Sequence, residues 1–402
     1  MSLPTFPTSS QVMYSSGDVK PSPTETRTSV YRTLDAWRGV AALAVMLFHI
    51  IGPLPNHETF LQNPIYALLM EGGAGIWLFF VISGYCITHA ATRSFQREEG
   101  VFQYAKARVR RIFPPCWFAL ALVLLASAAA TYLTAHGHMH DGTLTNKKLF
   151  EQTPLFYFAN LILMQIPLGQ DYILDPCWTL CYEVGFYALV GVSLAVAKKR
   201  GREDLLFDGL HALTIVSMLV LIITPKSVSY PLDFWPVFGL GVLVYDFIRD
   251  SRRKMMRALF AVTLVEFVIF GTLYKGGIGH FGDGGRTSAA VGVLFSCLLL
   301  FLHRFDNAMM KTKVFQLLGW IGTFSYSLYL THLLVVSGLE RIILASRHLP
   351  HTPAFMLFAC GLASIGVARV FFLVCERPFM NAKTRQKVVK EPEVERSAIP
   401  AG

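Results

Sequence analysis

The feature that most constrains this sequence is a series of apolar runs of about 20 residues each, separated by short polar or basic stretches. A helix needs about 20 mostly apolar residues to cross the ~30 Å hydrocarbon layer of a bilayer. Of the 402 residues, 53% are hydrophobic and only 15% are charged, whereas soluble proteins have about 25% charged residues. The lipid bilayer is therefore the solvent for most of this chain.

The runs predict an all-α, polytopic membrane helix bundle with about ten transmembrane spans. The predicted spans are residues 36–54, 74–92, 113–134, 178–197, 209–224, 232–248, 258–275, 287–303, 316–337 and 354–375. A shorter apolar piece, 154–168, has the length of a re-entrant or interfacial helix. If it does not cross, the basic loops all lie on one side of the membrane, so the positive-inside rule predicts that both termini are cytoplasmic.

Outside the predicted membrane domain, residues 32–380, the sequence predicts two cytoplasmic tails. Residues 1–31 are rich in Ser, Thr and Pro and contain no apolar run, which is typical of a disordered segment and not of a signal peptide. Residues 381–402 form the second predicted tail. The sequence contains no internal repeat of the kind that inverted-repeat transporters have.

Charge and cysteine content exclude two classes of partner. The formal net charge of +10 comes from Lys and Arg clusters between apolar runs, where they set topology, so we expect no nucleic-acid partner. Most of the seven cysteines lie inside apolar runs and are interpreted as small buried hydrophobes. Cys177 and Cys181 have no His or Cys partner at metal spacing nearby, so we predict no metal site.

The first predicted span, LDAWRGVAALAVMLFHI, carries ionisable residues that are costly inside a membrane. Arg38 and His49 are eleven residues apart, which places them on one helix face with a rise of about 16 Å between them. Asp35 is three residues before Arg38 and can pair with it. Arg38 alone is explained by a snorkelling anchor. A neutral His49 in an apolar site is a candidate general base for an alcohol.

Two further stretches offer binding groups. The second span, GGAGIWLFFVISGYCIT, has small residues typical of a packing seam. The alternative is a groove for an acyl chain or a pantetheine arm, with the Ser83 hydroxyl in it. The stretch KARVRRIFPP places Arg108 and Arg111 at i and i+3. Topology signalling explains this cluster, and the alternative is a clamp for phosphate groups, which guanidinium groups bind bidentately.

The fourth and ninth spans supply the remaining candidates. Glu183 in DPCWTLCYEVGFYAL lies five residues after Trp178, which suits the outer aromatic belt and predicts a depth of about 8 Å for the carboxylate. A carboxylate at that depth needs a partner, and His49 is predicted at a compatible depth. The ninth span contains GTFSYSLYLTH, with His332 near its outer end and Tyr326 below it. Two His and one Glu are thus expected to converge.

These segments together carry a family resemblance. RTLDAWRGVAALAVMLFH, GGAGIWLFFVISGYCIT, ARVRRIFP, WTLCYEVGFY, GTFSYSLYLTH and CERPF occur in the same order in the acyltransferase-3 family of membrane acyltransferases, which the chain resembles over about residues 32–380. The family's Arg, ten residues, His signature matches Arg38 and His49, and its Arg-x-x-Arg motif matches Arg108 and Arg111. Its span Glu matches Glu183. The chain departs from the family at Thr179, where Ser is common, and at Thr331, where Trp is common.

The resemblance implies transfer of an acyl group, commonly acetyl, from cytoplasmic acyl-CoA to a hydroxyl of a glycan or glycolipid at the plasma membrane. Some relatives acylate small molecules such as macrolides or nodulation factors, and that alternative stays open. In this hypothesis Arg108 and Arg111 dock the CoA with help from Arg38, and the arm follows the second span past Ser83. His49 is the general base, and Glu183 orients it or stabilises its imidazolium.

The remaining residues are assigned to substrate binding, and two alternatives stand beside this scheme. Tyr326 and His332 are assigned to substrate binding, with Tyr326 or Ser325 as a candidate donor to the oxyanion. A two-step mechanism through an acylated protein group is also open. The rival from another class is a proton-coupled secondary transporter, in which the intramembrane His, Glu and Arg form a relay.

Overall fold

The computed structural model describes residues 31–54, 62–137, 147–223, 230–249, 285–346 and 348–380. All of these residues belong to one unit of the chain, which begins at Tyr31. The predicted span 258–275 lies outside the described residues, and so do the two predicted tails apart from Tyr31.

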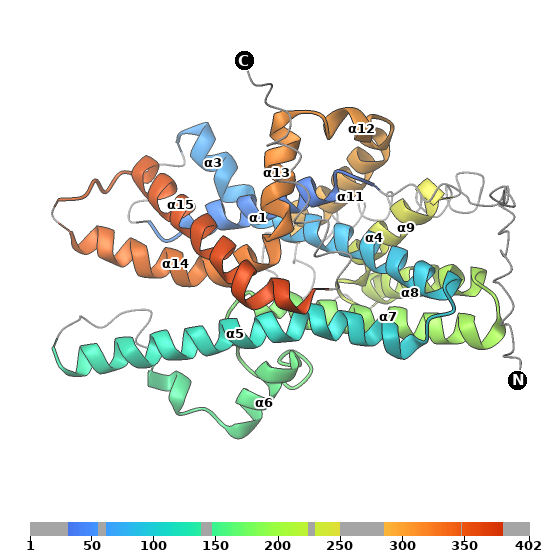
Figure 1. The fold of residues 1–402 in the computed structure, drawn as a ribbon, viewed down its shortest axis with the longest axis horizontal. Coiled ribbons are helices and arrows are strands. Elements are labelled where there is room, and N and C mark those ends of the chain that lie inside the picture. The colour runs from blue at the N-terminus through green and yellow to red at the C-terminus, as the bar shows by residue number, and fades with distance from the viewer. Residues whose placement is uncertain are drawn as a thin grey trace, which may run out of the picture. The chain divides into compact units, whose positions relative to one another are not determined.

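The described residues form helices and no strand, which confirms the predicted helical class. The helices drawn in Figure 1 are α1 (Leu34–Ile51), α3 (Pro64–Met70), α4 (Gly75–Gln96), α5 (Val101–Ala135), α6 (Pro154–Ile162), α7 (Cys177–Arg200), α8 (Asp204–Ile223), α9 (Trp235–Arg249), α11 (Gly285–Leu302), α12 (Asp306–Met309), α13 (Lys313–Thr323), α14 (Ser325–Ala345) and α15 (Pro353–Phe371).

Within the described part of the chain, seven helical segments are long and apolar enough to cross a membrane. They are Leu34–Ile51, Pro64–Gln96, Val101–Ala135, Cys177–Arg200, Val291–Met309, Ser325–Ala345 and Pro353–Phe379. Helices α8 and α9 form where two more spans are predicted, but they fall outside this group. The chain is therefore a multi-pass membrane protein, while the number of ten spans and the cytoplasmic termini stay predictions.

The ambiguous segment 154–168 contains only the nine-residue helix α6. Thr153 caps it by accepting a hydrogen bond from the Phe156 N–H, and Pro154 occupies its first turn. It ends at Leu163, which has a left-handed backbone conformation with φ of 55°. At 1.5 Å per residue this helix is about 14 Å long, so it is too short to cross the hydrocarbon layer.

Helix α5 differs from its prediction, because it begins at Val101 and runs for 35 residues. The Arg cluster is therefore part of the helix, and Pro114 and Pro115 lie inside it, whereas the sequence predicts a span that starts near them. A proline inside a helix removes a backbone hydrogen bond. In the turn next to the proline pair, the Tyr326 hydroxyl on α14 donates to the Ile112 carbonyl at 2.8 Å.

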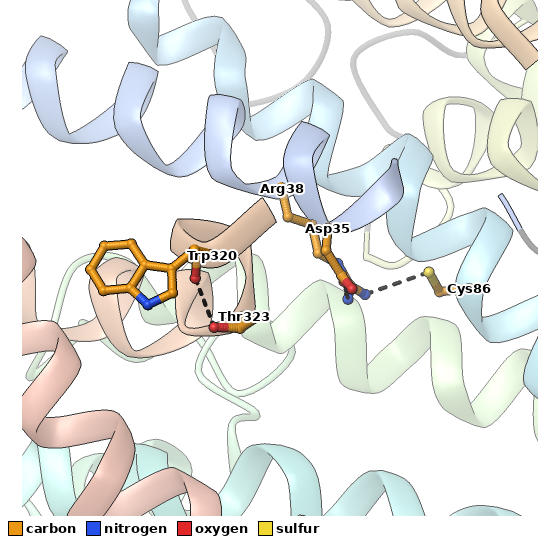
Figure 2. A network of polar contacts seen from close by, with 5 residues as sticks. All are labelled: Asp35, Arg38, Cys86, Trp320 and Thr323. Carbon is orange, nitrogen blue, oxygen red and sulfur yellow. Dashed lines mark hydrogen bonds and ion pairs between the residues drawn. The ribbon is translucent and has the colours of Figure 1, made fainter. Parts of the chain in front are cut away.

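The predicted ninth span is divided into α13 and α14 at Phe324. Phe324 has a non-helical backbone and is fully buried, and the Thr323 hydroxyl just before it donates to the Trp320 carbonyl at 2.7 Å (Figure 2). The membrane-length helix is α14 alone, which extends to Ala345. Ser325 and Tyr326 consequently lie in the first turn of a helix and not in the middle of one.

Helices α1 and α13 approach each other through two glycines. A Cβ added at Gly322 would lie 1.7 Å from the Asp35 carbonyl oxygen, and one at Gly39 would lie 2.2 Å from the Leu318 carbonyl oxygen. Any larger residue at either position would displace backbone, because real Cβ atoms do not come so close. This contact holds the N-terminal end of α1, where Asp35 and Arg38 lie, against α13.

The helices meet around α1, α4 and α5. Helix α1 packs against α13, α14, α4 and α15, and α4 packs against α9, α7 and α11. Helix α5 contacts α7 and α14 (Figure 1). Before α1, the Asp306 carboxylate accepts hydrogen bonds from the N–H groups of Arg32 and Thr33 at 2.6 and 2.9 Å, which ties the start of α1 to α12.

Candidate functional site

A cavity of about 650 Å³, including its mouth, lies where α1, α4, α5, α7 and α14 come together. Five of the eight predicted site residues line it, namely Arg38, Ser83, Arg111, Glu183 and Tyr326. The rest of the lining consists of Ile76, Phe79, Phe80, Ile112, Thr179, Leu180, Ser325 and Tyr329. The cavity thus combines two guanidinium groups and one carboxylate with hydroxyl groups and an apolar wall.

Arg38 lies in the first turns of α1 and is fixed by neighbours on two helices (Figure 2). Its Nη1 donates to Asp35 Oδ1 at 3.3 Å, and its Nη2 lies 3.5 Å from Cys86 Sγ on α4. Glu183 is also within electrostatic range of the guanidinium. The side chain is only 19% exposed. Two nearby carboxylates therefore compensate a largely buried positive charge.

Glu183 is held by two donors that both address the same oxygen. The Tyr187 hydroxyl, one helical turn further along α7, donates to Oε1 at 2.6 Å, and the Ser83 hydroxyl on α4 lies 3.4 Å from the same atom. Within the described residues no hydrogen bond reaches Oε2. The carboxylate is thus oriented by protein groups and still has acceptor capacity for a substrate.

The two arginines of the Arg-x-x-Arg pair have different surroundings. Arg111 lines the cavity, whereas Arg108 does not belong to its lining. The Arg108 guanidinium lies over the rings of Tyr104 and Tyr187, at 5.8 and 5.9 Å from their centroids. Its Nε is buried and has no hydrogen-bond partner among the described residues. The structure therefore brings Arg111 to the cavity and places Arg108 behind it, in contact with the tyrosine that holds Glu183.

Two further cavity hydroxyls, which the sequence analysis does not assign to the site, share helix faces with predicted site residues. The hydroxyls of Thr179 and Tyr329 lie 2.8 Å apart, and each donates to the Pro176 carbonyl, at 3.0 and 3.1 Å. Thr179 is four residues before Glu183, and Tyr329 is three residues after Tyr326. Residues at these spacings lie on the same helix face, so the periodicity of the motifs already contained this signal.

The CERPF segment contributes a second carboxylate close to the cavity, and this one is buried. Glu376 is 5% exposed and accepts a hydrogen bond of 2.6 Å from the Ser327 hydroxyl on α14. It belongs to a π-helical turn, Phe372–Glu376, that ends α15. Arg111 lies within electrostatic range of it. Arg111 therefore has a compensating carboxylate behind the cavity wall.

His49 and His332 form a pair that is separate from the cavity lining. Nε2 of His332 lies 3.4 Å from Nδ1 of His49, and the ring centroids are 5.1 Å apart. The His49 Nδ1 also contacts the Val45 carbonyl at 2.8 Å. His332 is 1% exposed, and its ring is 6.0 Å from the ring of Tyr329, which does line the cavity. Tyr329 thus connects the histidine pair with the cavity.

The predicted convergence of two His and one Glu occurs only for the two His. No hydrogen bond joins His49 to Glu183 in the described part of the chain, because Glu183 lies with Arg38 near the N-terminal end of α1 and His49 lies near its C-terminal end. Arg38 and His49 are about 16 Å apart along the axis of α1. The described residues also contain no group of three or more His, Cys, Asp or Glu that would hold a metal ion.

This arrangement favours a reaction between an anionic substrate and a hydroxyl group. Guanidinium groups in a cavity bind an anionic group, and a nearby imidazole pair can take up a proton from a hydroxyl. A comparison with protein families identifies the class of reaction directly, since the family model of the acyltransferase domain, Acyl_transf_3, matches residues 31–372. The chain belongs to the acyltransferase-3 family. It is therefore an acyltransferase for groups other than aminoacyl groups, as the motif order predicts.

Curated relatives of this acyltransferase are distant in sequence but cover most of the chain. It is 26% identical over 347 residues to the exopolysaccharide production protein ExoZ of Rhizobium meliloti, an alignment that covers 85% of the chain and 97% of ExoZ. It is 23% identical over 342 residues to the peptidoglycan O-acetyltransferase OatA of Listeria monocytogenes, and 22% identical over 334 residues to O-acetyltransferase OatA of Staphylococcus aureus. Those two alignments cover 76% and 74% of the chain and 49% of each OatA. No solved structure matches the chain.

Proposed function

We propose that this chain is an O-acyltransferase of the plasma membrane that moves an acyl group, acetyl in the first instance, from acyl-CoA to a hydroxyl of a glycan or glycolipid. The observation that carries the proposal is that Arg38, Arg111 and Glu183 line one cavity in a member of the acyltransferase-3 family. Two guanidinium groups in one cavity suit a donor that carries several phosphate groups.

The donor end of the site is the cavity between α1 and α5. Arg111 and Arg38 would hold phosphate oxygens there. The wall of Ile76, Phe79 and Phe80 on α4, together with the Ser83 hydroxyl, would accommodate the thioester arm. An apolar wall with a few fixed polar groups is the usual composition of a site for a ligand of this kind.

The acceptor class is supported by the names of the relatives. ExoZ is named for exopolysaccharide production and OatA for O-acetylation of peptidoglycan. Both names point to carbohydrate polymers, in which hydroxyl groups are the abundant nucleophiles. The alternative acceptor, a small molecule such as a macrolide or a nodulation factor, would leave the donor end of the site unchanged.

The chemical step assigns the general base to His49. Its imidazole takes the proton of the acceptor hydroxyl as the oxygen forms a bond to the thioester carbonyl carbon. The carbon–sulfur bond then breaks, and the proton is returned to the departing thiolate, which leaves as free CoA. Since Glu183 has its hydrogen bonds with Tyr187 and Ser83 at the donor end, its proposed role is to orient the donor through its free oxygen and to balance Arg38.

The proposal is tested with purified protein in lipid nanodiscs, with radiolabelled acetyl-CoA as donor. Release of free CoA and transfer of label are measured with two acceptor preparations, exopolysaccharide oligosaccharides and solubilised peptidoglycan strands. We expect donor-dependent CoA release that increases when an acceptor is present. His49→Ala should lower turnover by about 10²–10⁴-fold, the usual contribution of a general base. Normal turnover in that variant would reject the assignment of His49.

Two outcomes would reject the wider proposal. A wild-type protein that neither binds CoA nor releases it from any acyl-CoA would exclude acyl-CoA as donor. Uptake of a solute by the reconstituted protein without any acyl donor would favour the proton-coupled transporter. That rival is already disfavoured, because the family match covers residues 31–372.

A further inference from the structure

We infer that His332 is a positioning residue that holds His49 in the tautomer required of a general base. The inference rests on the proposed function, since it takes His49 as the base. It replaces the sequence-based assignment of His332 to substrate binding with a different role.

The proton on His332 is located by its backbone contacts. Nδ1 lies 3.0 Å from the Leu328 carbonyl oxygen and 2.8 Å from the Tyr329 carbonyl oxygen, both one turn earlier on α14. Carbonyl oxygens only accept hydrogen bonds, so Nδ1 must carry the proton that is donated. In a neutral imidazole the other nitrogen is then an acceptor. The His332 Nε2 lone pair therefore faces His49.

The proton on His49 follows from the same reasoning. Its Nδ1 lies 2.8 Å from the Val45 carbonyl oxygen and 3.4 Å from Nε2 of His332. Both neighbours are acceptors, so Nδ1 of His49 is the donor and its hydrogen is shared between them. The hydrogen bond is bifurcated: the shorter contact to the Val45 carbonyl is the stronger one, and the longer contact to His332 Nε2 is the weaker one.

The consequence concerns the opposite nitrogen of His49. With the proton fixed on Nδ1, the Nε2 of a neutral His49 has a free lone pair, and no hydrogen bond occupies it among the described residues. That nitrogen is the one able to accept a proton from a hydroxyl. After it does so, the Nδ1–H group carries positive charge and its hydrogen bonds to Val45 and His332 strengthen. His332 thus acts through His49, as the carboxylate of a catalytic triad acts through its histidine.

The surroundings of His332 suit this role better than substrate binding. Its side chain is 1% exposed, and both ring nitrogens are occupied by protein groups. A substrate hydroxyl would have to displace one of these partners to bind it. By contrast, His49 is only partly buried, at the C-terminal end of α1.

Two amide substitutions separate the functions of the two His332 nitrogens. His332→Asn keeps a short donor for the carbonyls of Leu328 and Tyr329 but does not reach His49. His332→Gln extends further and places an amide oxygen near the former Nε2 position, where it can accept from His49. We expect His332→Asn to lower kcat by about 10–100-fold, by analogy with the loss of the hydrogen-bond partner that orients a metal-bound histidine. KM for acetyl-CoA and for the acceptor should change little, and His332→Gln should restore most of kcat.

Three kinetic results would overturn the inference. A rise in KM for the acceptor with unchanged kcat in both variants would indicate substrate binding. Equal loss of activity in Asn and Gln variants that remain folded would mean that the acceptor nitrogen is not what matters. Wild-type kcat in His332→Asn would show that His49 needs no partner.

A spectroscopic measurement tests the same inference without any donor or acceptor. In protein labelled with ¹⁵N-histidine and reconstituted in lipid, the His49 resonances are assigned by difference from His49→Gln. We expect a neutral ring protonated at Nδ1 in the wild type and in His332→Gln, and a mixture of both tautomers in His332→Asn. A wild-type ring protonated at Nε2 would overturn the inference. An Nδ1–H signal in a protein that turns over no acyl-CoA would instead reject the proposed donor and support the positioning of His49.

Discussion

The hydroxyl of Tyr187 donates a hydrogen bond of 2.6 Å to the Glu183 carboxylate, one turn earlier on α7. The face of the same tyrosine ring receives the Arg108 guanidinium, whose central carbon lies 5.9 Å from the ring centroid. Arg108 therefore contacts the proposed donor end of the site through a tyrosine, although the Arg-x-x-Arg motif suggests a direct phosphate ligand. Cation–ring and carboxylate contacts on one side chain fix where Glu183 points.

The first prediction removes only the hydroxyl of this contact. Tyr187→Phe keeps the ring under Arg108 but leaves Glu183 Oε1 with the longer contact to Ser83. A hydrogen bond to a charged group contributes about 1.5–3 kcal/mol, so we expect kcat/KM for acetyl-CoA to fall about tenfold or more. The matched control is Tyr104→Phe, since Tyr104 also lies against Arg108 but its buried hydroxyl has no partner. Equal activity of the two variants would contradict the role of Tyr187.

The second prediction concerns the two arginines of the motif. Arg111→Ala removes a guanidinium from the cavity and should raise KM for acetyl-CoA about 10–100-fold, because a charge-assisted contact to phosphate is lost. Arg111→Lys should recover only part of that loss. The ammonium keeps the positive charge, but it cannot form the bidentate contact of a guanidinium group. Arg110→Ala, on the exposed face of the same turn of α5, is the control and should leave KM unchanged. An unchanged KM in Arg111→Ala would exclude this residue from donor binding.

The sequence predicts the helical elements, but it does not distinguish the surroundings of Arg108 and Arg111. The apolar runs predict the helical class, and the short length of segment 154–168 predicts an element that does not cross the membrane. In the Arg-x-x-Arg motif, Arg108 and Arg111 are both expected to bind phosphate groups. Their difference depends on which side of α5 meets the tyrosines of α7, and that orientation is a tertiary property.

The partner of Glu183 is a second tertiary property. The sequence pattern places Trp178 at an outer interface and so predicts that Glu183 pairs with His49. In the structure α7 is shifted relative to α1 so that Glu183 shares a cavity with Arg38. Depth along one helix follows from its sequence, but the shift between two helices is set by side-chain packing. The break at Phe324 is a similar case, because the apolar pattern continues through it without a proline.

The third prediction tests the close contact of α1 with α13. Gly322→Ala adds a Cβ that would lie 1.7 Å from the Asp35 carbonyl oxygen, so backbone must move. Overpacking of this kind costs about 1–3 kcal/mol, and we expect a lower apparent Tm in nanodiscs together with reduced turnover, since Asp35 pairs with Arg38. Gly319→Ala, on the same helix, meets nothing within 4 Å and should leave Tm unchanged or raise it slightly. A Tm of Gly322→Ala equal to that of Gly319→Ala would show that the helices are not in such close contact.

The last prediction concerns Asn160, a fully buried residue of α6. Its amide nitrogen donates to the carbonyls of Phe156 and Asp171, and its amide oxygen accepts from the Gln165 side chain and the Ile173 N–H. These bonds fold the chain that leads to the Pro176 carbonyl, which binds two cavity hydroxyls.

Asn160→Asp keeps the shape of the side chain but turns its two donor contacts into contacts between acceptors. Each buried group left unsatisfied costs about 1–3 kcal/mol, so we expect a clear loss of apparent Tm and of turnover. Gln170→Ala is the control, because the partly buried Gln170 also donates to two carbonyls, those of Leu168 and Gly169, through solvent-exposed hydrogen bonds. Thermal unfolding and acetyl-CoA turnover of both variants in the same nanodiscs make the comparison. An Asn160→Asp protein as stable and as active as Gln170→Ala would mean that this segment does not support the cavity.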